Sequence, residues 1–349
     1  MAEQVDRRAP VLVVGLPRSG TTWTARVLGA GPGARVVMEP DNEKTSAPAI
    51  SAKRGLGRYP VLAPGDQARA YRRLWTWALG GAPRSTALRL ADRVLREADD
   101  SELEASVSGR MPARLRVSGA LARLGLSHVT SESSPDRTVA KSVHACLAVE
   151  WIANELSSDV VVVRRHPANV LASWIELDLP DSDRGLEQHP AVQSRFVKPW
   201  GLSAPGPTAL ERAAWQIGLM SCVLEDACAR NPRWHVRSHE ALCGEPAQEF
   251  GRLYRDTGLE WSAHVEEVLS AGERPGSGFS LHRRSSELAE SWRTRLGESE
   301  VSVLRRVLAG FPLVDPWAQE HPIGTQEDEE FAETEAGTPG PPDQAPARS

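Results

Sequence analysis

The residues best suited to chemistry begin in a glycine-bearing turn at 15–22, with the sequence Gly-Leu-Pro-Arg-Ser-Gly-Thr-Thr. The apolar run at 11–15 predicts a buried parallel strand, and the pattern after the turn predicts a helix. Such a turn aims several backbone N–H groups at one point, and the helix dipole adds positive charge there. Because the turn also holds Arg18, Ser19 and two threonines, we expect an anion site rather than a plain structural turn.

The turn differs from the loops that bind nucleoside triphosphates and dinucleotides. The GxxxxGK[ST] loop needs a lysine for the β- and γ-phosphates, whereas Thr21 occupies that position here and the basic residue lies three positions earlier, at Arg18. The GxGxxG pattern is also missing, which argues against a Rossmann dinucleotide site. An NTP-dependent kinase is therefore kept only as an alternative.

A second candidate anion site follows the most apolar strand of the sequence, predicted at 159–165. This strand ends in Arg164-Arg165, and Ser173 lies eight residues after Arg165 in a predicted helix. An arginine at the carboxyl end of a buried parallel strand points into the crevice where open α/β sheets bind ligands. Its guanidinium offers two parallel hydrogen bonds to a phosphate. Which arginine points inward stays open, and a surface salt bridge is the structural alternative.

The two sites together resemble those of the sulfotransferases that use 3′-phosphoadenosine 5′-phosphosulfate (PAPS). The string Pro-Arg-Ser-Gly-Thr-Thr-Trp at 17–23 resembles the 5′-phosphosulfate loop of that family. The family's 3′-phosphate site has an arginine with a serine eight residues later, which favours Arg165 over Arg164. The resemblance implies that PAPS contacts Arg18, Ser19, Gly20, Thr21, Thr22, Trp23, Arg165 and Ser173. It also implies that Trp23 stacks on the adenine, with a core tryptophan as the alternative.

Sulfuryl transfer to a hydroxyl needs a base for the acceptor proton and positive charge at the departing phosphate oxygen. Glu39 is the first choice as base: it ends a predicted strand and lies 21 residues after Arg18, the spacing of the family's glutamate-base branches. His144 is the rival, because the phenol and steroid branch has a histidine in Lys-x-His, here Lys141-Ser-Val-His. Lys141 is expected to contact the sulfuryl oxygens or the acceptor. Arg18 is expected to stabilise charge, since an arginine does not donate a proton.

Strand, loop and helix recur along the chain, which predicts a P-loop-like α/β fold with a parallel sheet flanked by helices. Further strands are predicted at 35–39, 138–141 and 234–238. Helices are predicted at 66–80, 84–98, 111–124, 208–230, 246–257 and 298–309. The Pro- and Gly-rich stretch at 181–207 is predicted to be a long loop.

A single domain is predicted over residues 1–324, within which a helical insert at 66–125 is expected to form the acceptor side. Residues 325–349 consist mainly of Glu, Pro, Gly and Ala, a composition that predicts a disordered tail. The irregular stretch at 272–286 lies where the family folds a basic loop over the 3′-phosphate. Glu240 is expected to be a structural partner for backbone or arginine.

Charge and composition narrow the setting. The formal net charge is −5, but residues 325–349 hold seven acidic residues and one basic residue, which leaves +1 for residues 1–324. A near-neutral body gives no case for nucleic-acid binding. No apolar run of 18 residues predicts a membrane span. The four cysteines form no CxxC pair, so we expect no metal site and a reduced, cytoplasmic setting, while the oligomeric state stays open.

The sequence therefore predicts a sulfotransferase that moves a sulfuryl group from PAPS to a hydroxyl of a small-molecule acceptor. A carbohydrate, a lipid or a small natural product is expected, and the product is 3′-phosphoadenosine 5′-phosphate (PAP). The alternatives are the NTP-dependent kinase and a catalytically inactive PAP-binding protein. The inactive protein needs both anion sites but no base, so Glu39 separates it from the enzyme.

Overall fold

The computed structural model describes residues 9–80, 85–96, 112–127, 137–177, 185–272 and 290–313. The chain divides into two units, Met1–Val314 and Asp315–Ser349, and every described residue belongs to the first. The predicted tail at 325–349 lies outside the described residues, as does the irregular stretch at 272–286 beyond its first residue.

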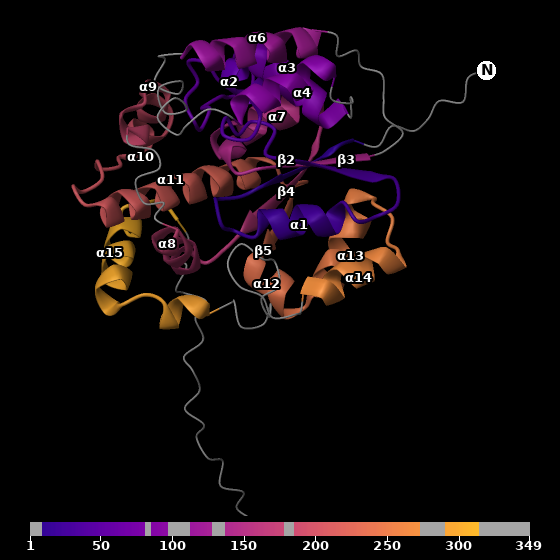
Figure 1. Ribbon diagram of the computed structural model, residues 1–349. Coiled ribbons are helices and arrows are strands. Elements are labelled where there is room, and N and C mark those ends of the chain that lie inside the picture. The colour runs from indigo at the N-terminus through magenta and orange to yellow at the C-terminus, as the bar shows by residue number, and fades with distance from the viewer. Residues whose placement is uncertain are drawn as a thin grey trace, which may run out of the picture. The chain divides into compact units, whose positions relative to one another are not determined.

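Within the described residues, five parallel strands form one sheet in the order β2-β3-β1-β4-β5, which confirms the predicted α/β class. They are β1 (Val11–Val14), β2 (Ala34–Met38), β3 (Arg137–Ser142), β4 (Asp159–Arg164) and β5 (His235–Ser238). The strand order reverses at β1, because the chain goes from β1 to the β2 edge and later reaches β4 on the other side (Figure 1). Open α/β sheets bind ligands at the carboxyl ends of strands beside such a reversal.

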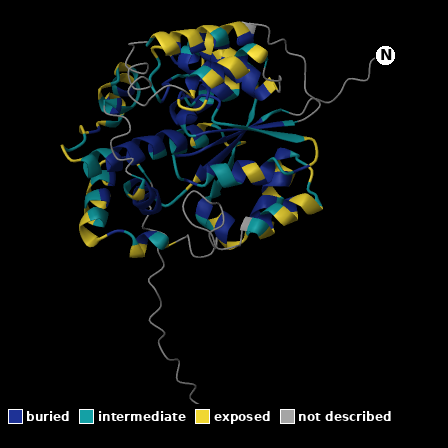
Figure 2. Ribbon diagram, in the orientation of Figure 1, coloured by how far each residue is buried: buried dark blue, intermediate teal, exposed yellow. Residues whose placement is uncertain are grey.

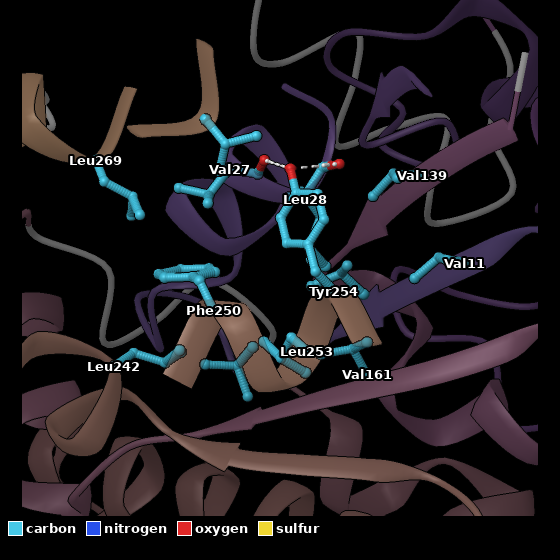
Figure 3. Close-up of a cluster of buried hydrophobic side chains, with 14 residues drawn as sticks. Val11, Val27, Leu28, Val139, Val161, Leu242, Phe250, Leu253, Tyr254 and Leu269 are labelled. Atoms are coloured by element: carbon cyan, nitrogen blue, oxygen red, sulfur yellow. Dashed lines mark hydrogen bonds between the residues drawn. The ribbon is translucent and has the colours of Figure 1, made fainter. Parts of the chain in front are cut away.

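One face of the sheet is covered by α1 (Thr21–Leu28), α13 (Pro246–Thr257) and α14 (Ala263–Gly272) (Figure 1). Their apolar side chains pack with those of the sheet into the buried cluster of Figure 3. Within it, the Tyr254 hydroxyl donates to the backbone oxygens of Val27 at 2.6 Å and Leu28 at 3.3 Å. The cluster therefore fixes the carboxyl end of α1, and with it the direction of the turn at the other end of that helix.

Helices of the predicted insert lie on the other side of the sheet (Figure 1). They are α3 (Arg69–Gly80), α4 (Thr86–Leu95) and α6 (Ala113–Ser127). Helix α2 (Ala47–Ala52), which lies before the insert and was not predicted, packs on all three. Helix α6 packs on α4 and α2, and α3 packs on α7 (Val149–Leu156). The insert is thus helical in its described parts, while residues 81–84 and 97–111 of it are not described.

Further helices complete the unit around the strand ends. They are α8 (Pro167–Glu176), α11 (Ala209–Arg230), α12 (His239–Gly244), α15 (Glu298–Leu308) and the 3₁₀ turns η1 (His144–Ala148) and η5 (Ser291–Thr294). Helix α11 contacts α7, α8 and α15. It begins with a capping box in which Thr208 and Glu211 exchange hydrogen bonds, the reason its predicted start is accurate.

The prediction of a long loop at 181–207 is wrong. Within its described part the chain forms four short helical segments: η2 (Leu186–Gln188), α9 (Pro190–Val192), η3 (Gln193–Val197, a π-helical turn) and α10 (Lys198–Trp200). Pro190 and Pro199 stand in first-turn positions, where proline starts a helix rather than prevents one. Val192 and Val197 are buried, so the segment packs as part of the unit.

Candidate active site

The turn after β1 has the tight geometry that its glycines predicted. Arg18 and Gly20 adopt positive φ angles of 72° and 94°. A Cβ on Gly15 would lie 2.4 Å from the backbone oxygen of Val163, and one on Gly20 would lie 2.1 Å from Cδ2 of His239. Both positions therefore require glycine, because any side chain would collide with β4 or with α12.

Helix α8 and the end of β4 hold this turn directly. The Arg18 guanidinium donates from Nε to the Ser173 hydroxyl at 2.8 Å. The next residue of α8, Trp174, donates from its indole to the backbone oxygen of Pro17 at 2.9 Å. Arg165 donates from Nη1 to the backbone oxygen of Arg18 at 2.7 Å. The two anion sites proposed from the sequence are thus in contact with each other.

The two candidate arginines at the end of β4 point to different surroundings. Arg164 is exposed and hydrogen-bonds the Cys228 thiol on α11, whereas Arg165 is partly buried beside the turn. Burial lowers the pKa of Arg165 to about 10, although the nearby Glu240 carboxylate raises it in part. The guanidinium therefore stays charged at neutral pH. Glu240 accepts from the backbone N–H of His166 at 3.0 Å, which makes it the structural partner expected for this corner.

Two buried donors at this place have no protein partner among the described residues. They are the Ser19 hydroxyl, in a residue only 1% exposed, and Nε of Arg165. A buried polar group left without a partner costs about 1–3 kcal/mol. A bound phosphate or sulfate would satisfy both, so the residues present fit a ligand with two anionic groups.

Glu39 and Lys141 form a partly buried ion pair at the ends of β2 and β3. The Lys141 ammonium donates to Oε1 of Glu39, and the Val143 N–H donates to Oε2 at 3.2 Å. The Glu39 N–H in turn donates to the backbone oxygen of Lys141 at 2.7 Å. Burial raises the pKa of Glu39, and the neighbouring Lys141 charge lowers it in part. The side chain of Glu39 keeps 18% of its surface exposed, so the carboxylate is oriented yet reachable.

The backbone is strained at two of the candidate residues. Among the described non-glycine residues, positive φ occurs at Arg18 (72°), Glu39 (47°) and Ser157 (48°). This left-handed conformation costs roughly 1–2 kcal/mol in an L-residue. Strain of this kind gathers at functional sites, and here it marks the arginine and the glutamate that the sequence singled out.

A cysteine that the sequence did not single out connects the ion pair to the turn. The Cys146 thiol, in η1, donates to the backbone oxygen of Gly15 at 3.2 Å. Burial raises the pKa of Cys146 to about 12, and the nearby Glu39 carboxylate adds to the rise. The thiol stays protonated, so Cys146 is a structural donor between the two halves of the site.

His144 lies in a buried polar network behind Glu39. Its Nδ1 is 3.3 Å from the Lys53 ammonium and 3.4 Å from the backbone oxygen of Asp41. Burial, and then the Lys53 charge, lower the pKa of His144 to about 3. The imidazole is therefore neutral at physiological pH, and its Nδ1 faces the network.

The rest of this network was missed by sequence reasoning. The buried Asp41 carboxylate accepts from the hydroxyls of Ser142 at 2.6 Å and Tyr71 at 2.8 Å, and its pKa is raised by burial. Lys53 donates to Glu43 at 2.7 Å, and that pairing keeps the pKa of Glu43 at about 2. The available signal was the polar spacing after Glu39 and the scarcity of lysine, since Lys53 is one of only four.

Trp23 lies beside the turn but packs on the core. Its ring meets Phe250 edge-on, with centroids 4.9 Å apart, and His239 at 6.3 Å. Its indole nitrogen is buried without a partner among the described residues. Stacking on an adenine stays a prediction for this residue.

The described residues contain no group of three or more His, Cys, Asp or Glu side chains arranged to hold a metal ion. None of the helices in the described part of the chain is long and apolar enough to cross a membrane.

Comparison with known proteins identifies the family. Residues 10–263 match the sequence profile of the sulfotransferase family. The chain is similar to the sulfotransferase domain from the curacin biosynthetic pathway, with 15% identity, a TM-score of 0.43, and 88% of this chain and 100% of that one covered. It is also similar to sulfotransferase STF1 from Mycobacterium tuberculosis H37Rv (17% identity, TM-score 0.42, 88% and 78% covered).

A third similar structure is retinol dehydratase in complex with androsterone and the inactive cofactor PAP, with 16% identity, a TM-score of 0.39, and 89% of this chain and 83% of that one covered. No curated protein matches the sequence. The family profile spans most of the chain, including both anion sites and the Glu39–Lys141 pair, and the protein therefore belongs to the sulfotransferase family.

Proposed function

We propose that this sulfotransferase takes its sulfuryl group from PAPS and transfers it to a hydroxyl of a small-molecule acceptor. The observation that carries the proposal is the contact between the two anion sites. Arg18 donates to Ser173, and Arg165 donates to the backbone of Arg18, at the strand ends where the sheet order reverses. Two adjoining cationic sites suit a nucleotide with phosphates at both its 5′ and 3′ positions.

The residues have separate roles in holding the donor. The N–H groups of the turn and the start of α1, at Ser19, Gly20, Thr21 and Thr22, are proposed to hold the 5′-phosphosulfate. Arg165 and Ser173 are proposed to hold the 3′-phosphate. Trp23 is proposed to contact the adenine from the α1 side.

Glu39 is proposed to accept the proton of the attacking hydroxyl. PAPS supplies a sulfuryl group on a phosphate leaving group: the acceptor oxygen forms a new S–O bond as the bond to the 5′-phosphate oxygen breaks. A base is most effective when its pKa lies near the operating pH, and burial raises the pKa of Glu39 in that direction. The hydrogen bonds from Lys141 and Val143 fix the orientation of its carboxylate.

Arg18 and Lys141 supply positive charge. Arg18 is proposed to stabilise the charge that develops on the departing phosphate, since a guanidinium stays protonated. Lys141 is proposed to contact the sulfuryl oxygens or the acceptor while it keeps Glu39 ionised. His144 is given no proton-transfer role, because its imidazole is buried, is a weak base with a pKa of about 3, and is turned to Lys53 through Nδ1. These roles involve no metal ion.

The acceptor is proposed to be a carbohydrate, a lipid or a small natural product that enters from the side of the α2–α6 helices. Helix α2 follows the Glu39 segment, and α6 packs on α2, so the insert adjoins the base. The proposed setting is the cytoplasm.

The test is transfer of radiolabelled sulfate from [³⁵S]PAPS to a panel of hydroxyl compounds. Wild type is expected to label at least one acceptor and to release PAP, whereas Glu39→Gln is expected to bind PAP normally and label none. A Glu39→Gln variant with full activity would remove Glu39 from the mechanism, and His144→Ala would then be examined. PAP binding without transfer in wild type, across a broad panel, would favour the inactive PAP-binding protein.

A further inference from the structure

Helix α6 is apolar on two opposite faces. The inner face is buried against α2 and α4 and carries Leu115, Ala122 and Leu126. The outer face carries a stripe of four exposed apolar residues: Ala113, Val117, Ala120 and Leu124. Their spacing of four, three and four residues places them in one line along the helix. A helix that covers only a protein core needs one apolar face, so the outer stripe requires a separate explanation.

The exposure of this stripe is unusual for the chain. The large apolar side chains that stand exposed in the described part of the chain are Leu90 (47%), Val117 (54%) and Leu124 (56%). All three belong to α4 and α6, which pack on each other. Figure 2 shows the exposed residues along the outer sides of both helices. Single exposed leucines are ordinary, but Val117 and Leu124 lie in one line of α6, and Leu90 is exposed on the helix that packs on it.

Arginines flank these aliphatic side chains. On α6, Arg114 lies on one side of the stripe and Arg116 and Arg123 lie on the other, all exposed. On α4 the exposed positions include Arg89 and Arg93, and Arg96 is exposed directly after the helix ends. Helix α6 contains no acidic residue, and the single acidic residue of α4, Asp92, is buried and accepts from the Ala47 N–H at 3.0 Å. The outer sides of the two helices, here called the α4–α6 surface, are therefore both aliphatic and cationic.

We propose that the α4–α6 surface binds anionic lipid bilayers. Val117, Leu124 and Leu90 would enter the boundary between headgroups and acyl chains, while the arginines reach the lipid phosphates. An anionic bilayer offers apolar depth and negative charge together. The proposal concerns peripheral binding only, and it stands independently of the donor and base assigned above.

Other occupants fit this surface less well. A second copy of the chain docked through the same surface would bring arginines against arginines. A protein partner needs roughly 1,000 Å² of well-packed interface, and such interfaces draw on aromatic anchors, which α6 lacks. Three aliphatic side chains and a cationic rim are instead enough for reversible binding to a bilayer.

The test is sedimentation of the full-length protein with vesicles. One set is phosphatidylcholine alone, and the other contains about two-fifths phosphatidylglycerol. The first variant, Arg116→Gln/Arg123→Gln, removes two charges beside the stripe. Its matched control, Arg26→Gln/Arg255→Gln, removes two exposed arginines from α1 and α13, on the other side of the sheet. A third variant, Val117→Ser/Leu124→Ser, tests the aliphatic contribution, and thermal melts verify that all three fold.

Wild type is expected to bind the anionic vesicles and leave the neutral ones in solution, more weakly as salt rises. Each arginine near an anionic bilayer contributes roughly fivefold, so the double variant at 116 and 123 is expected to lose about 30-fold in affinity. The control is expected to stay within about twofold, and the serine variant to lose binding as well. Failure of wild type to bind anionic vesicles, or equal losses in the control, would overturn the proposal. Self-association that Val117→Ser/Leu124→Ser abolishes would assign the surface to a second copy and overturn it too.

Discussion

Substitution of Arg165 distinguishes the proposed 3′-phosphate site from the proposed 5′-phosphosulfate site. If Arg165 holds the 3′-phosphate, Arg165→Ala removes charge-assisted hydrogen bonds worth about 1.5–3 kcal/mol each. Two such bonds correspond to a loss in PAP affinity of roughly 10²- to 10⁴-fold. The substitution also removes the 2.7 Å bond to the backbone oxygen of Arg18, which loosens the turn. A loosened turn would weaken the binding of every ligand that contacts the turn. A ligand without the 3′-phosphate is therefore needed as a reference.

The assay is calorimetric titration with PAP and with adenosine 5′-phosphate, which lacks the 3′-phosphate. Arg165→Ala is expected to weaken PAP by roughly 10²-fold or more and adenosine 5′-phosphate by less than about tenfold, since only the loosened turn affects the latter. Arg164→Ala is the matched control, because that side chain is exposed and turned to Cys228. Equal weakening of the two ligands, or a larger effect from Arg164→Ala, would refute the assignment.

Three further predictions follow from the site. The midpoint of the acid limb in the pH profile of kcat/KM lies above pH 4.5, because burial raises the pKa of Glu39 and the base works deprotonated. A midpoint below pH 4.5 contradicts this role of Glu39. Lys53→Met lowers the free energy of unfolding in urea by about 3 kcal/mol, since it removes the buried ammonium that pairs with Glu43 and leaves that carboxylate only Arg58, at 3.3 Å. The difference in unfolding free energy between wild type and Lys53→Met becomes smaller as pH falls from 4.5 towards 2, where Glu43 protonates in the wild type too. Gly20→Ala abolishes PAP binding, because the new Cβ collides with the His239 ring. Adding His239→Ala restores binding only in part, since it relieves the collision but leaves the positive φ at position 20, which costs about 1–2 kcal/mol. Unchanged binding in Gly20→Ala would disprove the tight turn.

The strands and the two anion sites were open to prediction because their signals are local. A β-branched apolar run followed by Gly15-Leu-Pro-Arg-Ser-Gly predicts both a buried strand and an anion-binding turn. The apolar run at 160–163 is likewise followed by Arg164-Arg165, which predicts a second anion site at the end of a buried strand. Parallel strands bring their carboxyl ends to one edge of the sheet, so placing the two sites together required only the fold class.

The contacts that join the sites were beyond sequence reasoning. That Arg18 binds Ser173, and that Cys146 binds the oxygen of Gly15, depends on partners more than a hundred residues apart. The polar network around Lys53 was missed for the same reason, since burial of a lysine is decided by tertiary packing. The 181–207 segment differs for another reason: its prolines predict a loop, but Pro190 and Pro199 stand in the first turns of short helices.

The two joined anion sites are proposed to accept a nucleotide with phosphates at its 5′ and 3′ positions. The most direct test is the thermal stabilisation of the wild-type protein by PAP compared with ATP–Mg²⁺. Ligand at 100 times its Kd is expected to stabilise the protein by about 2.7 kcal/mol. We expect a clear rise in melting temperature with PAP and little with ATP–Mg²⁺. A large rise with ATP–Mg²⁺ and none with PAP would contradict it.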